Sequence, residues 1–182
     1  MTYEIRPRPF NPKAINGQSE EILVSHYESS YIGAIKRLNA IAAQLAELDY
    51  AKAPASMITG LKREGLITMN SMILHQAYFE GLGGGDTPHG ALAAATARDF
   101  GSTDRWWTEF AAMGKAEGGG SDCVVLAYSP RDKRFINQWA TRSYDDFGLW
   151  AAGARPRYVR ALPITWIPAL RSHPASTTGT MR

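Results

Sequence analysis

Two histidines, His26 and His75, are the side chains in this sequence most suited to holding a metal ion. Each lies in a stretch whose apolar residues recur every three or four positions, which predicts two consecutive long helices. Neighbouring helices commonly build metal sites from inward-facing side chains. On spacing alone, however, a buried histidine that is hydrogen-bonded within a core is the commoner arrangement.

Aromatic residues accompany both histidines and strengthen the metal hypothesis. Tyr27 and Tyr31 follow the first histidine, and Tyr78 and Phe79 follow the second. Such side chains can orient metal ligands and exclude bulk water, and Tyr31 and Tyr78 are our candidates for this supporting role. The single cysteine, Cys123, cannot make a thiolate site by itself, so histidine and carboxylate must hold any metal.

The elements that would position the two histidines follow from the pattern along the chain. Residues 1–18 contain three prolines and are expected to form an extended arm. A helix is predicted to begin at Ser19, whose hydroxyl can cap it, and to continue to about residue 48. After a short link at 56–65, either helical or a turn, a second and largely buried helix is predicted over 67–81.

A glycine run after residue 81 is the clearest boundary in the sequence. We place a domain division near residue 86, with the arm and an α-hairpin domain at 1–86 and an incomplete α+β domain at 87–141. The second domain is predicted to contain two helices, the second capped by Thr103 and Asp104, and two short strands joined by a hairpin turn. These elements are expected over 92–100, 103–116, 124–128 and 134–139.

Four segments lie in order along about residues 19–140: LVSHYESSYIGAIKRLN, NSMILHQAYFEGL, FGSTDRWWTEFAAMGKA and VVLAYSPRDKRFINQW. Together they resemble the iron/manganese superoxide dismutase family. The resemblance implies an α+β fold with a long N-terminal helical hairpin followed by a helical domain with a small antiparallel sheet. It also implies that His26 and His75 each donate a ring nitrogen to one Fe or Mn ion. That ion would disproportionate superoxide to oxygen and hydrogen peroxide, an antioxidant activity, in a homodimeric enzyme.

The chain departs from the family's pattern at several positions near the expected metal. Asp122-Cys123 stands where the family usually has Gly-Trp, which removes an aromatic side chain. The gateway tyrosine of better-known members falls at Ala34, and Tyr31 is our candidate for its replacement. The glutamine that typical iron forms carry four residues before the second histidine is Ser71, so the sequence does not decide between Fe and Mn.

Residues 142–182 lack the Asp-x-x-x-His segment with which the family completes its metal site. They contain six arginines, two aspartates and no lysine or glutamate, a composition typical of GC-rich coding DNA read out of frame. Permissible codons for residues 154–161, read one nucleotide later, give Leu-Asp-Leu-Asp-Met-Tyr-Glu-His, which contains the missing motif. We therefore interpret 142–182 as an aberrant, frameshifted tail that is disordered at its end, and the nucleotide sequence tests this interpretation.

A chain with two of four protein ligands should hold Fe or Mn weakly, and little or no dismutase activity is expected from it. The alternative is a non-catalytic remnant or interaction protein that retains the helical hairpin, in which His26 and His75 are core residues. The family's dimer contacts lie partly in the aberrant segment, which weakens the case for a homodimer here.

Composition limits the other classes of function. The net charge of +3 and the isoelectric point near 9.1 arise from the arginine-rich residues 142–182, because residues 1–141 carry nearly balanced charge. We therefore do not expect nucleic-acid binding. Apolar runs are too short to span a membrane, and the N-terminus lacks the hydrophobic block of a signal peptide. A cytoplasmic protein without a membrane partner is expected.

Overall fold

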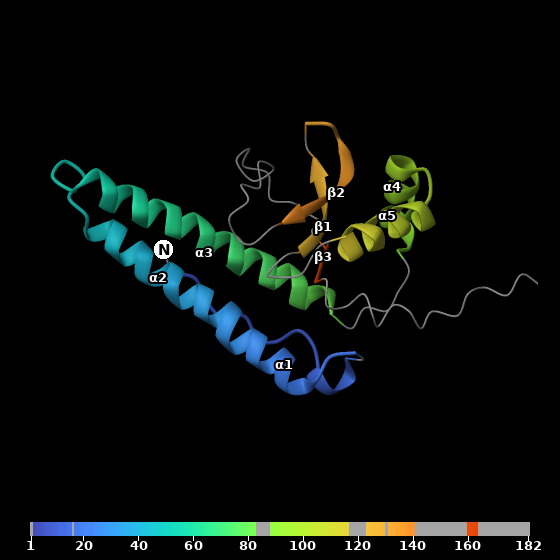
Figure 1. The fold of residues 1–182 in the computed structure, drawn as a ribbon, viewed down its shortest axis with the longest axis horizontal. Helices are drawn as coiled ribbons and strands as arrows, with labels where there is room; N and C mark the ends of the chain where they lie inside the picture. Colours follow the sequence, from blue (N-terminus) through green and yellow to red (C-terminus); the bar gives the residue numbers. More distant parts are fainter. Residues whose placement is uncertain are drawn as a thin grey trace, which may run out of the picture.

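The computed structural model describes residues 2–15, 17–82, 88–116, 123–129 and 131–140, and the backbone of residues 160–163. In these parts of the chain, a small antiparallel sheet lies between a long helical hairpin and a pair of shorter helices (Figure 1). The α+β class predicted from the sequence is confirmed. No helix in the described residues is both long and apolar enough to cross a membrane.

The first arm of the hairpin comprises α1 (Glu20–Ser25), the π-helical turn η2 (His26–Tyr31) and α2 (Ile32–Glu47). The backbone N–H of Ile22 donates to the hydroxyl of Ser19 at 3.2 Å, so the predicted cap is confirmed. The predicted long helix from Ser19 is confirmed as one continuous helical segment, whose backbone widens to a π-helical turn at η2.

The second arm of the hairpin is α3 (Ala55–Gly81), a continuous helix of 27 residues that begins directly after Pro54. The predicted link at 56–65 is therefore helical, not a turn, and it is continuous with the second predicted helix. Gly60 and Gly65 lower the helix propensity of this stretch, but α3 packs along α2 and the packing outweighs propensity. At Gly65, a Cβ would lie only 3.5 Å from the side chain of Ile41.

The N-terminal arm runs along the hairpin and has one regular turn, the 3₁₀ helix η1 (Pro12–Ala14). Two hydrogen bonds tie it to α2, since the Asn39 side chain accepts from Tyr3 N at 2.8 Å and donates to Tyr3 O at 2.9 Å. Farther along the arm, the ring of Phe10 stacks on Phe79 of α3 at 5.3 Å. The proline-rich arm is thus fixed on the hairpin by specific contacts.

Helices α4 (Gly90–Phe100) and α5 (Thr103–Ala116) are joined by a tight turn. Gly101 takes the left-handed conformation there, with φ +90°. The bounds of α5 match the prediction, but its cap is Ser102, whose hydroxyl accepts from Arg105 N at 3.0 Å. Thr103, predicted as the cap, instead shares a hydrogen bond with Thr96 at 3.1 Å.

The sheet consists of β1 (Cys123–Ser129), β2 (Arg134–Ala140) and β3 (Arg160–Pro163), all antiparallel, in the order β2-β1-β3. The predicted hairpin of β1 and β2 is confirmed, and β3 adds a third strand from within 142–182. The proposed domain division near residue 86, and the rest of that tail, lie outside the described residues.

Both faces of β1 are buried, in two different cores. Val125 and Ala127 belong to the core of the helical hairpin, whereas Val124 and Leu126 pack with Trp106 of α5 and its neighbours. This alternation is expected of a strand, because successive side chains point to opposite faces. The central strand therefore joins the hairpin to α4 and α5.

Candidate metal centre

His26 occupies the first position of the π-helical turn η2, directly after the short helix α1. Its ring is partly buried and faces α3, where it contacts the rings of His75, Tyr78 and Phe79. No hydrogen bond to a nitrogen of His26 occurs among the described residues, so neither nitrogen is committed to a protein partner there.

His75 lies in the C-terminal half of α3, and its ring is oriented by the preceding turn of the same helix. Its Nδ1 lies 2.6 Å from the carbonyl oxygen of Ser71 and 3.3 Å from the Ser71 hydroxyl. A carbonyl oxygen can only accept, so Nδ1 carries the proton and donates it. The Nε2 lone pair is therefore left available to a metal, an arrangement common for metal-binding histidines.

The two histidines meet between the hairpin helices, with 4.9 Å between their ring centroids and an angle of 72° between the ring planes. Burial, together with a smaller effect of charge repulsion from His75, lowers the pKa of His26 to about 4. Burial also lowers the pKa of His75, although its hydrogen bond to Ser71 opposes that shift. Both rings are thus neutral at pH 7, the form that binds metals.

Tyr78 lies against His26, with 5.3 Å between ring centroids. Its hydroxyl donates to the side-chain oxygen of Gln18 at 3.1 Å. Burial raises the pKa of Tyr78 to about 12, an effect that the Gln18 hydrogen bond reduces and that Cys123 reinforces. Tyr78 therefore remains protonated and closes one side of the histidine pair.

Tyr31 does not contact the histidine pair directly, because Phe79 lies between them. Its ring contacts Tyr27 and Phe79, and Phe79 in turn contacts both histidines. Its hydroxyl accepts from Gln76 Nε2 at 3.1 Å and from the backbone N–H of Arg6 at 3.3 Å. Among the described residues, Tyr31 therefore reaches the histidines through Phe79.

Two glutamines and the N-terminal arm are parts of this site that the sequence pattern did not indicate. Gln18 and Gln76 hold the hydroxyls of Tyr78 and Tyr31, and Arg6 contributes only its backbone. The Gln18–Tyr78 pair spans 60 residues of sequence, and neither glutamine lies in a local motif. The one available signal for Gln76 is its position directly after His75.

The described residues fit a metal ion in part. Two neutral imidazoles are suitable ligands for Fe or Mn, which also accept carboxylates and water. Within the described ranges, however, no three His, Cys, Asp or Glu side chains form a group that could bind a metal. The region in which the family's Asp-x-x-x-His segment would fall lies largely outside those ranges, so the geometry defines half of a metal centre.

Comparison with known proteins identifies the family to which this α+β chain with its paired imidazoles belongs. The chain is 58% identical over 156 residues to the iron superoxide dismutase of Cupriavidus metallidurans, covering 86% of this chain and 77% of that protein. It is 31% identical over 157 residues to manganese superoxide dismutase 2 of Haloferax volcanii, covering 84% and 75% respectively.

A third relative, manganese superoxide dismutase 1 of Halobacterium salinarum, is 32% identical over 155 residues, 82% of this chain and 74% of that protein. No family model matches the chain. The identities and coverage place the chain in the iron/manganese superoxide dismutase family of enzymes.

Proposed function

We propose that His26 and His75 are two ligands of one Fe or Mn ion and that superoxide is the substrate of this site. The observation that carries the proposal is the histidine pair itself, with its rings 4.9 Å apart between two helices. The relatives are iron and manganese superoxide dismutases by name, which supports Fe or Mn as the metal.

The protein's own groups would prepare this site before a metal binds. The Ser71 carbonyl fixes the tautomer and orientation of His75, and burial keeps both imidazoles unprotonated. Tyr78 and Phe79 cover the pair and limit the access of water, while Tyr31 is held near the site by Gln76. The bound ion would supply one-electron chemistry, oxidising one superoxide to oxygen and reducing another to peroxide.

The chain as written is expected to bind this ion weakly and to show little activity. Two imidazoles are half of the ligand set that the family resemblance implies, and the described residues offer no third ligand. The alternative remains a non-catalytic remnant or interaction protein that keeps the hairpin. A cytoplasmic location, the absence of nucleic-acid and membrane partners, and the weakened case for a homodimer stay predictions.

Metal analysis of the purified chain, together with a superoxide-consumption assay, tests the two-histidine site. We expect less than one Fe or Mn ion per chain, and we expect that fraction to be lost in His26→Ala and in His75→Ala. His89→Ala is the matched control, because His89 is exposed at the start of α4. Equal metal content in all four proteins would overturn the proposed site.

A repaired tail tests whether the missing ligands explain weak binding. Residues 154–161 would be replaced by Leu-Asp-Leu-Asp-Met-Tyr-Glu-His, the alternative reading of the same codons. We expect metal content to rise toward one ion per chain and superoxide consumption to rise with it. A folded replacement variant with no gain in either quantity would favour the non-catalytic alternative.

A further inference from the structure

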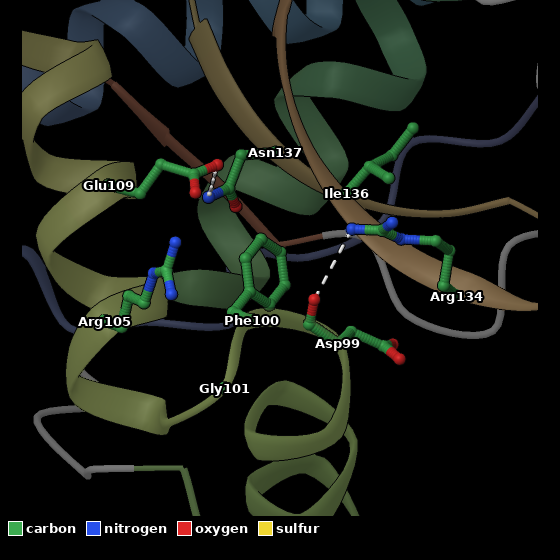
Figure 2. Close-up of a pocket in the computed structure, with 8 residues that line it drawn as sticks. All are labelled: Asp99, Phe100, Gly101, Arg105, Glu109, Arg134, Ile136 and Asn137. Carbon is green, nitrogen blue, oxygen red and sulfur yellow. Dashed lines mark hydrogen bonds between the residues drawn. The ribbon is translucent and has the colours of Figure 1, made fainter.

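A hollow lies where the α4–α5 turn meets β2 (Figure 2). Its volume is about 430 Å³, which falls in the range of small-molecule sites. The partly buried ring of Phe100 lies within it, and the guanidinium groups of Arg105 and Arg134 flank that ring. None of these residues contributes to the proposed metal centre.

The two arginines come from different elements and face the same space. Arg105 projects from the first turn of α5, and Arg134 projects from the first residue of β2. Arg134 Nη2 donates to the backbone oxygen of Asp99 at 3.4 Å, which holds its guanidinium beside the hollow. Among the described residues, neither arginine forms an ion pair with a carboxylate.

The two acidic residues around the hollow already have partners. The side chain of Asp99 is only 5% exposed and accepts from Arg98 Nε at 2.6 Å and from Phe135 N at 2.7 Å. Arg98 therefore neutralises the charge of Asp99. Glu109 accepts from Asn137 Nδ2 at 2.9 Å, so its carboxylate is engaged with a neutral partner.

A rigid polar wall completes the hollow. The Oδ1 atom of Asn137 accepts from the indole Nε1 of the buried Trp106 at 3.0 Å, and its amide donates to Glu109. Both ends of the Asn137 side chain are therefore fixed. When the Arg98–Asp99 pair is counted as neutral, the guanidiniums of Arg105 and Arg134 and the carboxylate of Glu109 leave the hollow with net positive charge.

We propose that this hollow is a binding site for a small organic phosphate that carries an apolar ring. The phosphoryl group would lie between Arg105 and Arg134, and the ring would pack on Phe100. A phosphate carries a charge of about −2 and three acceptor oxygens, which match two guanidinium forks, and the start of α5 adds a favourable dipole.

Titration of the full chain with three probes tests the proposal. Phenyl phosphate carries the charge and the ring, inorganic phosphate carries the charge alone, and phenol carries the ring alone. The indole N–H signal of Trp106 reports binding through its bond to Asn137, and that of Trp139, which donates to Met113 O, is the internal reference. We expect phenyl phosphate to bind most tightly, and to bind more weakly as salt is added.

Substitutions identify the side chains that bind phenyl phosphate. Arg105→Ala and Arg134→Ala should each weaken phenyl phosphate binding by about tenfold or more, because each removes charge-assisted hydrogen bonds. Lys115→Ala, an equal change of charge at an exposed position of α5, should leave it unchanged. Glu109→Gln removes the remaining negative charge while preserving an acceptor for Asn137, and should strengthen binding.

Three outcomes would overturn the proposal. The first is the absence of a Trp106 shift with phenyl phosphate in a chain whose circular dichroism shows it to be folded. The second is equal weakening by Lys115→Ala and Arg105→Ala, which would indicate nonspecific charge attraction. The third is equal binding of inorganic and phenyl phosphate, which would remove the role of Phe100. All three can be measured with or without metal, so they are independent of the proposed dismutase site.

Discussion

The hydroxyl of Tyr31 in η2 forms hydrogen bonds with both the N-terminal arm and α3. It accepts from Arg6 N and Gln76 Nε2, and the tyrosine is only 2% exposed. Tyr31→Phe removes the acceptor and leaves two donors without it, so we expect the free energy of unfolding to fall by about 1–3 kcal/mol. Urea denaturation measures this change.

Tyr50→Phe is the matched control for the loss of a hydroxyl. Tyr50 is half exposed, and its hydroxyl donates to Leu45 O at the surface, where water can replace the bond. We expect a change below about 0.5 kcal/mol. Similar losses in the two variants would show that the Tyr31 contacts contribute nothing specific.

Residue types and spacing predicted the histidine pair but not the hydrogen bonds around it. His26, His75 and Tyr78 are recognisable because each lies on a stretch predicted to be a long helix, and the structure places them in contact. Gln18 and Gln76 are ordinary polar residues whose partners are fixed only when distant segments pack. The roles of His26 and His75 as metal ligands, and of Tyr78 as a supporting group, stay predictions.

Among the helices and strands, the α4–α5 turn gives a clear test of backbone conformation. Gly101 has φ +90°, which a residue with a Cβ adopts only with strain, so Gly101→Ala should lower the free energy of unfolding by about 1 kcal/mol. Gly60, in the exposed middle of α3, has open space around it. Gly60→Ala should raise stability by about 0.5–1 kcal/mol. Thermal unfolding measures both changes. If the two variants shift the free energy of unfolding in the same direction, this interpretation of Gly101 is contradicted.

Asp99 connects the end of α4 to β2 and should make stability depend on pH. The hydrogen bond from Arg98 and the one from Phe135 N hold the pKa of Asp99 below its usual value, against the effect of burial. Because the folded-state pKa is depressed, the stabilisation is complete above the unfolded pKa of about 3.9 and is lost as pH falls through the folded pKa.

The Asp99→Asn variant tests this link between the two elements. It should be less stable than the parent chain at pH 7, and its stability should fall less steeply as the pH drops below about 4. Glu64→Gln, at an exposed position of α3, is the control. Chemical denaturation at a series of pH values measures both, and an unchanged acid slope in Asp99→Asn would contradict the assignment.

Local sequence signals predicted the ends of helices well where a capping or helix-breaking residue defines the end. They predicted them poorly where tertiary packing defines the end. Ser19 marked the start of α1, and the bounds of α5 were predicted correctly. The continuity of α3 through 56–65 was not predicted, because Gly60 and Gly65 suggest either a short helix or a turn when read locally. The packing of α3 along α2 is a tertiary effect that the local sequence does not show.

On the scale of the whole molecule, β1 contributes to both cores and should couple their unfolding. Val125 is fully buried against the helical hairpin, and Val124 is buried against α5. Val125→Ala should cost about 2 kcal/mol from lost apolar burial and the resulting cavity. Far-UV and near-UV circular dichroism should still give one shared midpoint, shifted downward. Separate midpoints would instead support independent domains on either side of residue 86.

The π-helical turn explains how one straight stripe can be buried along the whole first arm of the hairpin. Leu23, Tyr27, Tyr31 and Ile35 are all buried, and they follow one another at intervals of four residues. In a regular α-helix, three such intervals would rotate the stripe around the axis by about 120°. Widening the backbone at His26–Tyr31 takes up that rotation. An unbroken run of fours is therefore a pattern by which such turns can be sought in other chains, and here it marks the segment that begins with a histidine of the proposed metal site.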